Sequence, residues 1–211
     1  MFEINYFLDG VALTPLAQVY KTLTPHLFRK GVSNVLDNLL DPINSINSLL
    51  QGKPELAAQG VARFLINSIL GVFGIFDLAE ACGLPQHKED FGQTLAVWGV
   101  DPGPYLVLPL IGPTSTRDFI GRVIDAFADP INMTLNSNNK SGYVYLRYSV
   151  YIISKRSQAI EAFDTIYETS IDPYATFRSL YQQHRLNEIM DGVPESFAGG
   201  PESYINDEEE F

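Results

Sequence analysis

Helical spacing of apolar positions dominates the chain. Between Gly31 and Gly52, apolar residues recur in steps of three, four and one, which places them on one side of a helix. Asp41-Pro42 interrupts this spacing, and Pro ends one helix as readily as it opens the next. The pattern therefore predicts two shorter helices that meet at Asp41.

Capping and helix-starting residues place the remaining helices. We predict helices from Thr14-Pro15 to before Pro25, from Pro54 to near Gly83, from Ser115 (with Asp118 three residues later) through residue 128, from Ser141 to about Ser170, and from Asp172-Pro173 onward. The chain has no alternating run long enough for a sheet. These features predict one all-α domain over residues 1–190 and an acidic, flexible tail over residues 191–211.

Fifteen residues from Phe64 to Leu78 form the most apolar stretch, in which only Asn67, Ser68 and Asp77 are neither apolar nor Gly. As a helix the stretch would measure roughly 22 Å, less than the roughly 30 Å hydrocarbon core of a bilayer. It could be a buried core helix or a segment that enters one membrane leaflet without crossing it. The candidate membrane-embedded residues are Phe64, Leu65, Ile66, Ile69, Leu70, Val72, Phe73, Ile75 and Phe76.

The composition changes in the segment "FGQTLAVWGVDPGPYLVLPLIGPTSTRD", which holds four Gly and four Pro among apolar residues. Pro fixes φ and Gly permits unusual turns, so this segment predicts an ordered, extended connector with defined bends. We expect Gly103-Pro104-Tyr105 and Leu108-Pro109 to form a fixed bend.

Charge excludes one class of partner. The net charge is −11, but seven acids and no bases lie from Asp191 onward, which leaves 18 acids against 14 bases before it. Neither part offers the basic surface that binds a phosphate backbone, so nucleic acid is not an expected partner.

Cys82 is the only cysteine, and we expect it to be a small core residue. The first ten residues do not resemble a signal peptide, which suggests a cytosolic protein or a chain that begins after its targeting segment.

Motifs of catalysis are missing from the sequence. It contains no G-x-S-x-G, H-E-x-x-H or P-loop pattern and no cysteine pair. His26, His87 and His184 lie in unrelated segments and are interpreted as surface or capping residues rather than metal ligands. Asp118 beside Arg117 could be a lipase acid, but capping of its own helix is the better interpretation. We expect no catalytic residue, metal or cofactor.

Three segments together resemble the MlaA (VacJ) family of outer-membrane lipoproteins: "RFLINSILGVFGIFDLA", the Gly/Pro connector and "DPYATFRSLYQQHR". The resemblance runs from about Phe2 to Ile189. Its most specific part is the connector, where the motif residues are Gly92, Gly99, Gly103, Pro104, Tyr105, Pro109, Gly112, Arg117 and Asp118.

The resemblance implies a ring-like helical domain that lies in the inner leaflet of the outer membrane on the periplasmic side. Members of this family are associated with trimeric porins and pass mislocalised outer-leaflet phospholipids through a central channel to a periplasmic lipid carrier. They are made with a signal peptide and an acylated Cys. This sequence lacks that Cys, so we expect the lipoprotein anchor to have been trimmed from it. A phospholipid hydrolase or a scaffold that only positions a porin are the alternatives.

The long helix from Ser141 could supply a polar wall for such a channel. Arg147, Tyr151, Ser154, Gln158 and Glu161 share one face at helical spacing. This face could be a solvated exterior or a lipid pathway. Arg156 projects among apolar residues on the opposite side, where it would form an ion pair, snorkel, or meet a lipid phosphate.

Overall fold

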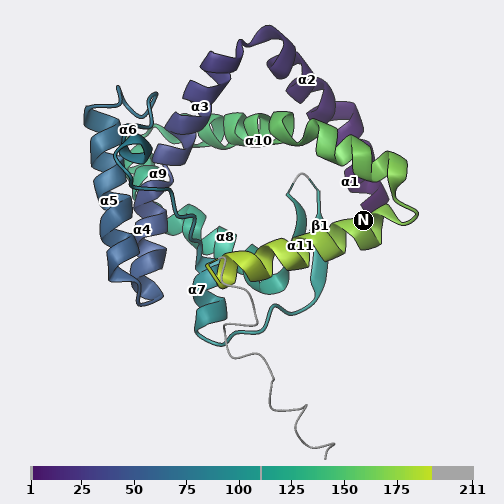
Figure 1. Cartoon of the computed structure of the whole chain (residues 1–211). Coiled ribbons are helices and arrows are strands. Elements are labelled where there is room, and N and C mark those ends of the chain that lie inside the picture. Colours follow the sequence, from purple (N-terminus) through teal and green to yellow (C-terminus); the bar gives the residue numbers. More distant parts are fainter. Residues whose placement is uncertain (1, 110, 192–211) are drawn as a thin grey trace, which may run out of the picture.

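The computed structural model describes residues 2–109 and 111–191, which fold into a ring of helices (Figure 1). The first half of the ring contains α1 (Phe2–Leu8), a π-helical turn η1 (Asp9–Leu13), α2 (Thr14–Leu23), α3 (His26–Asn38), α4 (Asp41–Leu50), α5 (Pro54–Ile69) and α6 (Leu78–Ala81). The second half contains α7 (Phe91–Val97), β1 (Tyr105–Leu108), β2 (Gly112–Ser115), α8 (Thr116–Ala128), α9 (Pro130–Ser137), α10 (Ser141–Thr169) and α11 (Pro173–Ile189).

Most helix starts lie where capping residues predicted them. α4 begins at Asp41, and α2 begins at Thr14 and ends before Pro25. Ser115 caps α8 by accepting a hydrogen bond from the backbone N–H of Asp118 at 3.1 Å. Asp172 caps α11 through the N–H of Ala175 at 3.0 Å. The all-α prediction is confirmed, and the predicted tail lies outside the described residues from 192 onward.

The helix predicted from Pro54 to near Gly83 is wrong in its second half, because α5 ends at Ile69. After it the chain turns, with positive φ at Val72, Phe73 and Gly74. Side chains then replace the helical hydrogen bonds: Asn67 Oδ1 accepts from the N–H of Ala79 at 3.0 Å, which starts α6. The spacing of apolar residues gives no sign of such hydrogen bonds between a side chain and a helix start that lies further along the chain.

Cys82 is exposed, so its predicted core position is wrong. It follows the single turn of α6, in which Ala79 is the buried residue, and the cysteine therefore points away from the interior.

The connector contains a hairpin that the sequence did not predict. β1 and β2 pair in antiparallel register, with Tyr105 opposite Ser115 and Leu108 opposite Gly112. Each strand has only four residues, too few to show an alternating pattern. The hairpin contacts α1, α8 and α11.

Contacts between distant elements close the ring. α10 contacts α2, α3 and α9, while α11 contacts α7, β2 and α10 (Figure 1). α4 contacts α5, α7 and α9. As a result, segments from both ends of the described chain face a common centre.

Burial in this ring is the reverse of that in an ordinary globular domain. Most of the residues buried in the described ranges are polar or charged, including Asn47, Gln93, Asp129, Asn132 and Ser154. Many large apolar side chains are exposed instead, as in α1, α2, α5 and α8. Extensive exposed apolar surface is typical of a membrane or protein contact. No helix in the described ranges is both long and apolar enough to cross a bilayer.

Candidate functional site

A cavity of about 850 Å³ occupies the centre of the ring. Side chains from α1, η1, α3, α4, α7, α8, α10, α11 and the hairpin line it. Its wall combines apolar residues such as Leu36, Ile43 and Val123 with charged residues from several helices. Such a mixed lining can accommodate an amphiphile, with acyl chains against the apolar part and a headgroup against the charged part.

α10 forms one wall of the cavity, but not entirely through the predicted face. Arg147, Tyr151 and Arg156 line the cavity. Ser154, Gln158 and Glu161 do not belong to the lining: Ser154 is buried, and Glu161 is exposed and pairs with Lys21 of α2 at 2.9 Å. The cavity-facing side of α10 is therefore rotated from the predicted stripe toward Tyr148, Ile152, Lys155, Ala159, Phe163 and Tyr167.

The two arginines predicted on α10 form buried ion pairs. Arg147 Nη1 donates to Asp129 Oδ2 at 2.7 Å, and both side chains are more than nine-tenths buried. Arg156 donates two hydrogen bonds of 2.8 Å to the Asp9 carboxylate and a third, of 3.0 Å, to Thr14 Oγ1. The ion-pair interpretation of Arg156 is confirmed. This pair joins the start of the chain to α10 and fixes η1 beside the cavity.

Aromatic rings form the apolar end of the wall. Phe2, Phe163, Tyr167 and Phe177 all line the cavity and meet with ring centroids 5.0 to 6.5 Å apart. The Arg156 guanidinium lies 4.4 Å from the centre of the Phe163 ring, where its charge is favourably placed over the aromatic face.

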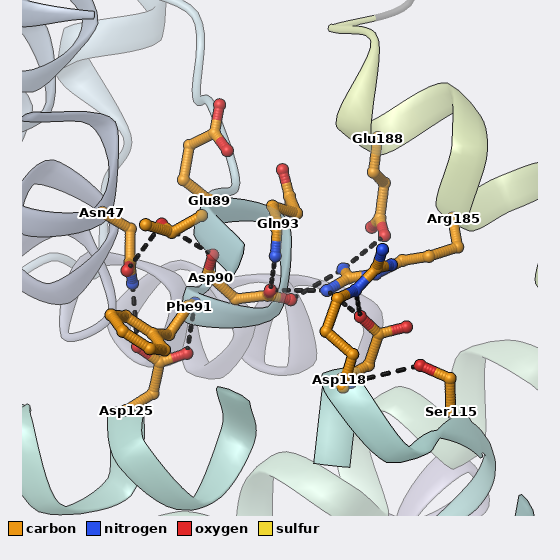
Figure 2. A network of polar contacts seen from close by, with 12 residues as sticks. Asn47, Glu89, Asp90, Phe91, Gln93, Ser115, Asp118, Asp125, Arg185 and Glu188 are labelled. Carbon is orange, nitrogen blue, oxygen red and sulfur yellow. Dashed lines mark hydrogen bonds and ion pairs between the residues drawn. The ribbon is translucent and has the colours of Figure 1, made fainter. Parts of the chain in front are cut away.

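A polar network ties α11 to α7 and α8 (Figure 2). Arg185 donates to both oxygens of Asp90 at 2.6 and 2.8 Å, to Asp118 at 3.1 Å and to Glu188 at 3.0 Å. Tyr181 donates to the other oxygen of Asp118. Because Arg185, Asp90 and Glu188 also line the cavity, this network is part of its wall.

The network determines the charge state of Asp118. Burial alone would raise the pKa of Asp118, but the hydrogen bond from Tyr181 and the charge of Arg185 outweigh it and lower that pKa to about 2. An aspartate held ionised by an arginine is a structural anion. The interpretation that Asp118 caps its own helix is wrong for its side chain: Ser115 Oγ is the cap and accepts from the Asp118 N–H, while the Asp118 carboxylate accepts from Arg117, Tyr181 and Arg185.

Asp125, two turns further along α8, has the opposite environment. It accepts hydrogen bonds from the Phe91 N–H at 2.9 Å and from Asn47 Nδ2 at 2.8 Å (Figure 2). Burial nevertheless raises the pKa of Asp125 to about 6, because these hydrogen bonds compensate only part of the lost hydration.

The connector motif contributes geometry rather than reactive groups. Gly92 lies so close to α8 and α11 that a Cβ there would be 2.5 Å from Arg185 Nη2 and 2.8 Å from Asp118 Oδ1. Gly103, with φ of +67°, provides the predicted unusual backbone before β1. Gly99 and Gly112 also have positive φ. Strand β1 begins at Tyr105, between Pro104 and Pro109. Arg117 forms an ion pair with Asp118.

The cavity residues that were not predicted include three basic ones. Lys88 precedes α7, Arg122 lies on α8 and Lys155 lies on α10, and all three line the cavity. They are 33 to 67 residues apart in sequence, so no local pattern links them; only the ring closure brings them to one space.

The three histidines are exposed, as predicted. Within the described residues, no group of three or more His, Cys, Asp or Glu side chains is arranged to hold a metal ion.

The apolar stretch after Arg63 is exposed rather than buried in a core. Phe73 is 81% and Ile69 is 73% exposed, and the side chains of Leu65, Leu70, Val72, Ile75 and Phe76 are also exposed. Phe64 and Ile66 are half-buried. The stretch therefore presents an apolar surface at the side of the ring formed by α5 and α6 (Figure 1).

Comparisons with known proteins agree with this architecture. An uncharacterized protein of Rickettsia conorii is 37% identical over 198 residues, which cover 93% of this chain and 76% of the relative. The "Intermembrane phospholipid transport system lipoprotein MlaA" of Haemophilus influenzae is 30% identical over 196 residues, covering 91% of this chain and 76% of that protein.

A solved structure described as "Structural basis for maintenance of bacterial outer membrane lipid asymmetry" matches with a TM-score of 0.76 and 30% identity. The match covers 89% of this chain and 94% of that chain. A model of the family described as "MlaA lipoprotein" matches residues 1–188. The chain therefore belongs to the MlaA lipoprotein family.

Proposed function

We propose that this protein is a non-enzymatic conduit for phospholipid at the Gram-negative outer membrane. The observation that carries this proposal is the reversed distribution of polarity: a cavity of about 850 Å³ with a partly charged wall lies inside a ring whose outside is apolar. A lipid in such a ring keeps its headgroup in a polar environment while the protein remains immersed among acyl chains.

The outer surface supports a position in one leaflet. The exposed side chains from Leu65 to Phe76 would be solvated by lipid tails, and we place this surface in the inner leaflet, on the periplasmic side. A lipoprotein anchor would reinforce this attachment, as the names of the relatives imply.

The proposed pathway runs along α10. Arg147, Tyr151 and Arg156 face the cavity, and we assign them to the pathway wall. The lipid would be mislocalised outer-leaflet phospholipid. A trimeric porin would hold the ring in place and a periplasmic carrier protein would receive the lipid. Both are proposed on the resemblance to the family.

Reconstitution with a porin in vesicles tests the proposal. Labelled phospholipid should pass to an acceptor carrier at a rate that depends on this protein, without release of free fatty acid. Sustained release of fatty acid would show that the protein is a hydrolase rather than a conduit. Stable porin binding without any lipid transfer would indicate a scaffold instead.

A further inference from the structure

Most charges in the cavity wall are already neutralised by a partner. Arg147 pairs with Asp129, Arg156 pairs with Asp9, and Arg185 pairs with Asp90 and Glu188. Glu89 pairs with Lys53 at 3.1 Å. These groups form the wall but leave little net charge for a ligand.

Lys88 and Lys155 are different, because they share a single carboxylate. Lys155 Nζ lies 3.3 Å and Lys88 Nζ lies 3.7 Å from the same oxygen, Asp37 Oδ1. Both lysines line the cavity, whereas Asp37 does not. One carboxylate can neutralise only one of the two ammonium groups.

Arg122 adds a third positive charge to the cavity lining, from α8. It lines the cavity and forms no ion pair or hydrogen bond with any residue of the described ranges. It faces the same cavity as Lys88, Lys155 and Tyr151, and Lys155 Nζ lies 5.3 Å from the centre of the Tyr151 ring.

The charge balance at the two lysines is therefore positive. Lys88 and Lys155 carry two positive charges against the one carboxylate of Asp37, a surplus of one. Arg122 faces the same cavity, and Asp125, three residues further along α8, offsets its charge. Arg147 is paired with Asp129, whereas Glu188 shares Arg185 with Asp90 and Asp118. Unpaired ammonium and guanidinium groups in a partly dry cavity bind phosphate oxygens through charge-assisted hydrogen bonds.

The apolar part of the same wall begins two turns further along α10. Phe163 follows Lys155 by eight residues, a rise of about 12 Å, and belongs to the aromatic group with Phe2, Tyr167 and Phe177. A phosphate at the lysines would therefore leave attached acyl chains beside aromatic and aliphatic side chains.

We propose that Lys88, Arg122 and Lys155 form a binding site for the phosphate diester of a phospholipid headgroup within the central cavity. This inference rests on the proposed function and deepens it by naming where the headgroup is held.

Binding of short-chain lipids by the detergent-solubilised protein tests the site. The probes are dihexanoylphosphatidylglycerol, dihexanoylglycerol, which has no phosphate, and inorganic phosphate. Lys88→Gln, Arg122→Gln and Lys155→Gln should each weaken binding of the phosphatidylglycerol by about tenfold, since each removes one charge-assisted hydrogen bond. Binding of dihexanoylglycerol should not change.

Two further variants sharpen the test. Asp37→Asn removes the competing carboxylate and should strengthen binding of the phosphatidylglycerol by about tenfold, an effect that loss of folding could not produce. Lys140→Gln changes an exposed lysine outside the cavity lining and should leave binding unchanged.

The outcomes separate this site from the proposed function. The phosphate site would be overturned if the variants lost equal affinity for both lipids, or if none of the three variants lost affinity. Either result leaves the proposed conduit standing as long as the wild type still transfers lipid. Inorganic phosphate that binds as tightly as the lipid would identify a free-phosphate site and overturn the headgroup assignment. Failure of the wild type to bind or transfer either lipid would overturn the conduit itself.

Discussion

Buried ion pairs connect parts of the ring that are distant in sequence, and Arg156 with Asp9 is the longest such connection. Their side chains are 8% and 12% exposed and 147 residues apart. Taking charges out of water is costly, so such a pair joins the elements firmly only while both members are present.

Arg156→Met should therefore destabilise the fold by about 3–5 kcal/mol, because it leaves the Asp9 carboxylate buried without its partner. Denaturant unfolding in detergent would measure the loss. Lys21→Met is the matched control, since it breaks the exposed pair between α2 and Glu161 and should change stability little. Equal effects of the two substitutions would contradict a special role of the buried pair.

Asp41 and Asp125 should make the protein less stable as the pH rises. Burial raises the pKa of each to about 6 in the folded state, against about 4 for an unfolded aspartate. The folded state thus binds protons more tightly, and its stability should fall between about pH 4 and pH 6 and stay level above. Unfolding midpoints at several pH values would show this slope.

Asp125→Asn should reduce that slope to about half, because only Asp41 then titrates in this range. Asp118 acts in the opposite direction: its pKa of about 2 lies below the unfolded value, so stability is lost only as the pH falls from about 4 toward 2. A slope that Asp125→Asn does not alter would show that other groups cause it.

At the scale of elements, α7 and α8 cross at Gly92 and Gly121, so neither helix has a side chain at the point of contact. A Cβ on Gly121 would lie 2.3 Å from the backbone nitrogen of Gly92, and a Cβ on Gly92 would enter the Arg185 network. Close helix contact of this kind depends on glycine at both positions.

Gly121→Ala should therefore separate α7 from α8 and destabilise the protein by about 1–3 kcal/mol, the usual effect of overpacking. Gly142→Ala is the control, because nothing lies within 4 Å of the added methyl group in the first turn of α10. It should be neutral or slightly stabilising, since Ala favours helix more than Gly. Thermal unfolding of both variants in one detergent would compare them.

Helix starts could be predicted from the sequence because their causes are local. Asp41-Pro42, Ser115 and Asp172 each act within four residues of the helix that they open. The end of α5 could not be predicted, because Asn67 and Asp77 complete the turns through side-chain contacts. The hairpin was missed because its four-residue strands are too short to show alternation and pack against α1 and α11, at the two ends of the described chain.

The candidate site was predictable only in part for the same reason. Arg147, Tyr151 and Arg156 were found from the pattern of α10 alone and do line the cavity. Which face of α10 points inward depends on where α2 packs against it, and that contact lies outside the helix itself. Lys88 and Arg122 come from other elements, so their association follows from the closed ring.

At the scale of the whole molecule, the ring exposes its apolar residues and buries its polar ones. Water would have to hydrate the surface from Leu65 to Phe76, and burying such side chains in lipid or against a partner is favourable by about 1.5–3 kcal/mol each. We therefore expect the protein to self-associate in water without detergent or porin.

Replacement of two of these side chains tests where the molecule meets the membrane. Ile69 and Phe73 are among the most exposed residues of the α5–α6 surface, and Ile69→Ser with Phe73→Ser should weaken binding to phospholipid vesicles by about a hundredfold, measured by flotation. The matched control replaces Phe127, which is as exposed as Phe73, and Ile171, which is more exposed than Ile69, with Ser; they lie on α8 and in the turn between α10 and α11. If the control pair weakens binding as much, the α5–α6 surface has no special part in insertion and the ring meets lipid around its whole edge. If neither pair weakens it, the exposed apolar surface is covered by protein instead, and a porin should then protect Ile69 and Phe73 from modification after each is replaced by Cys.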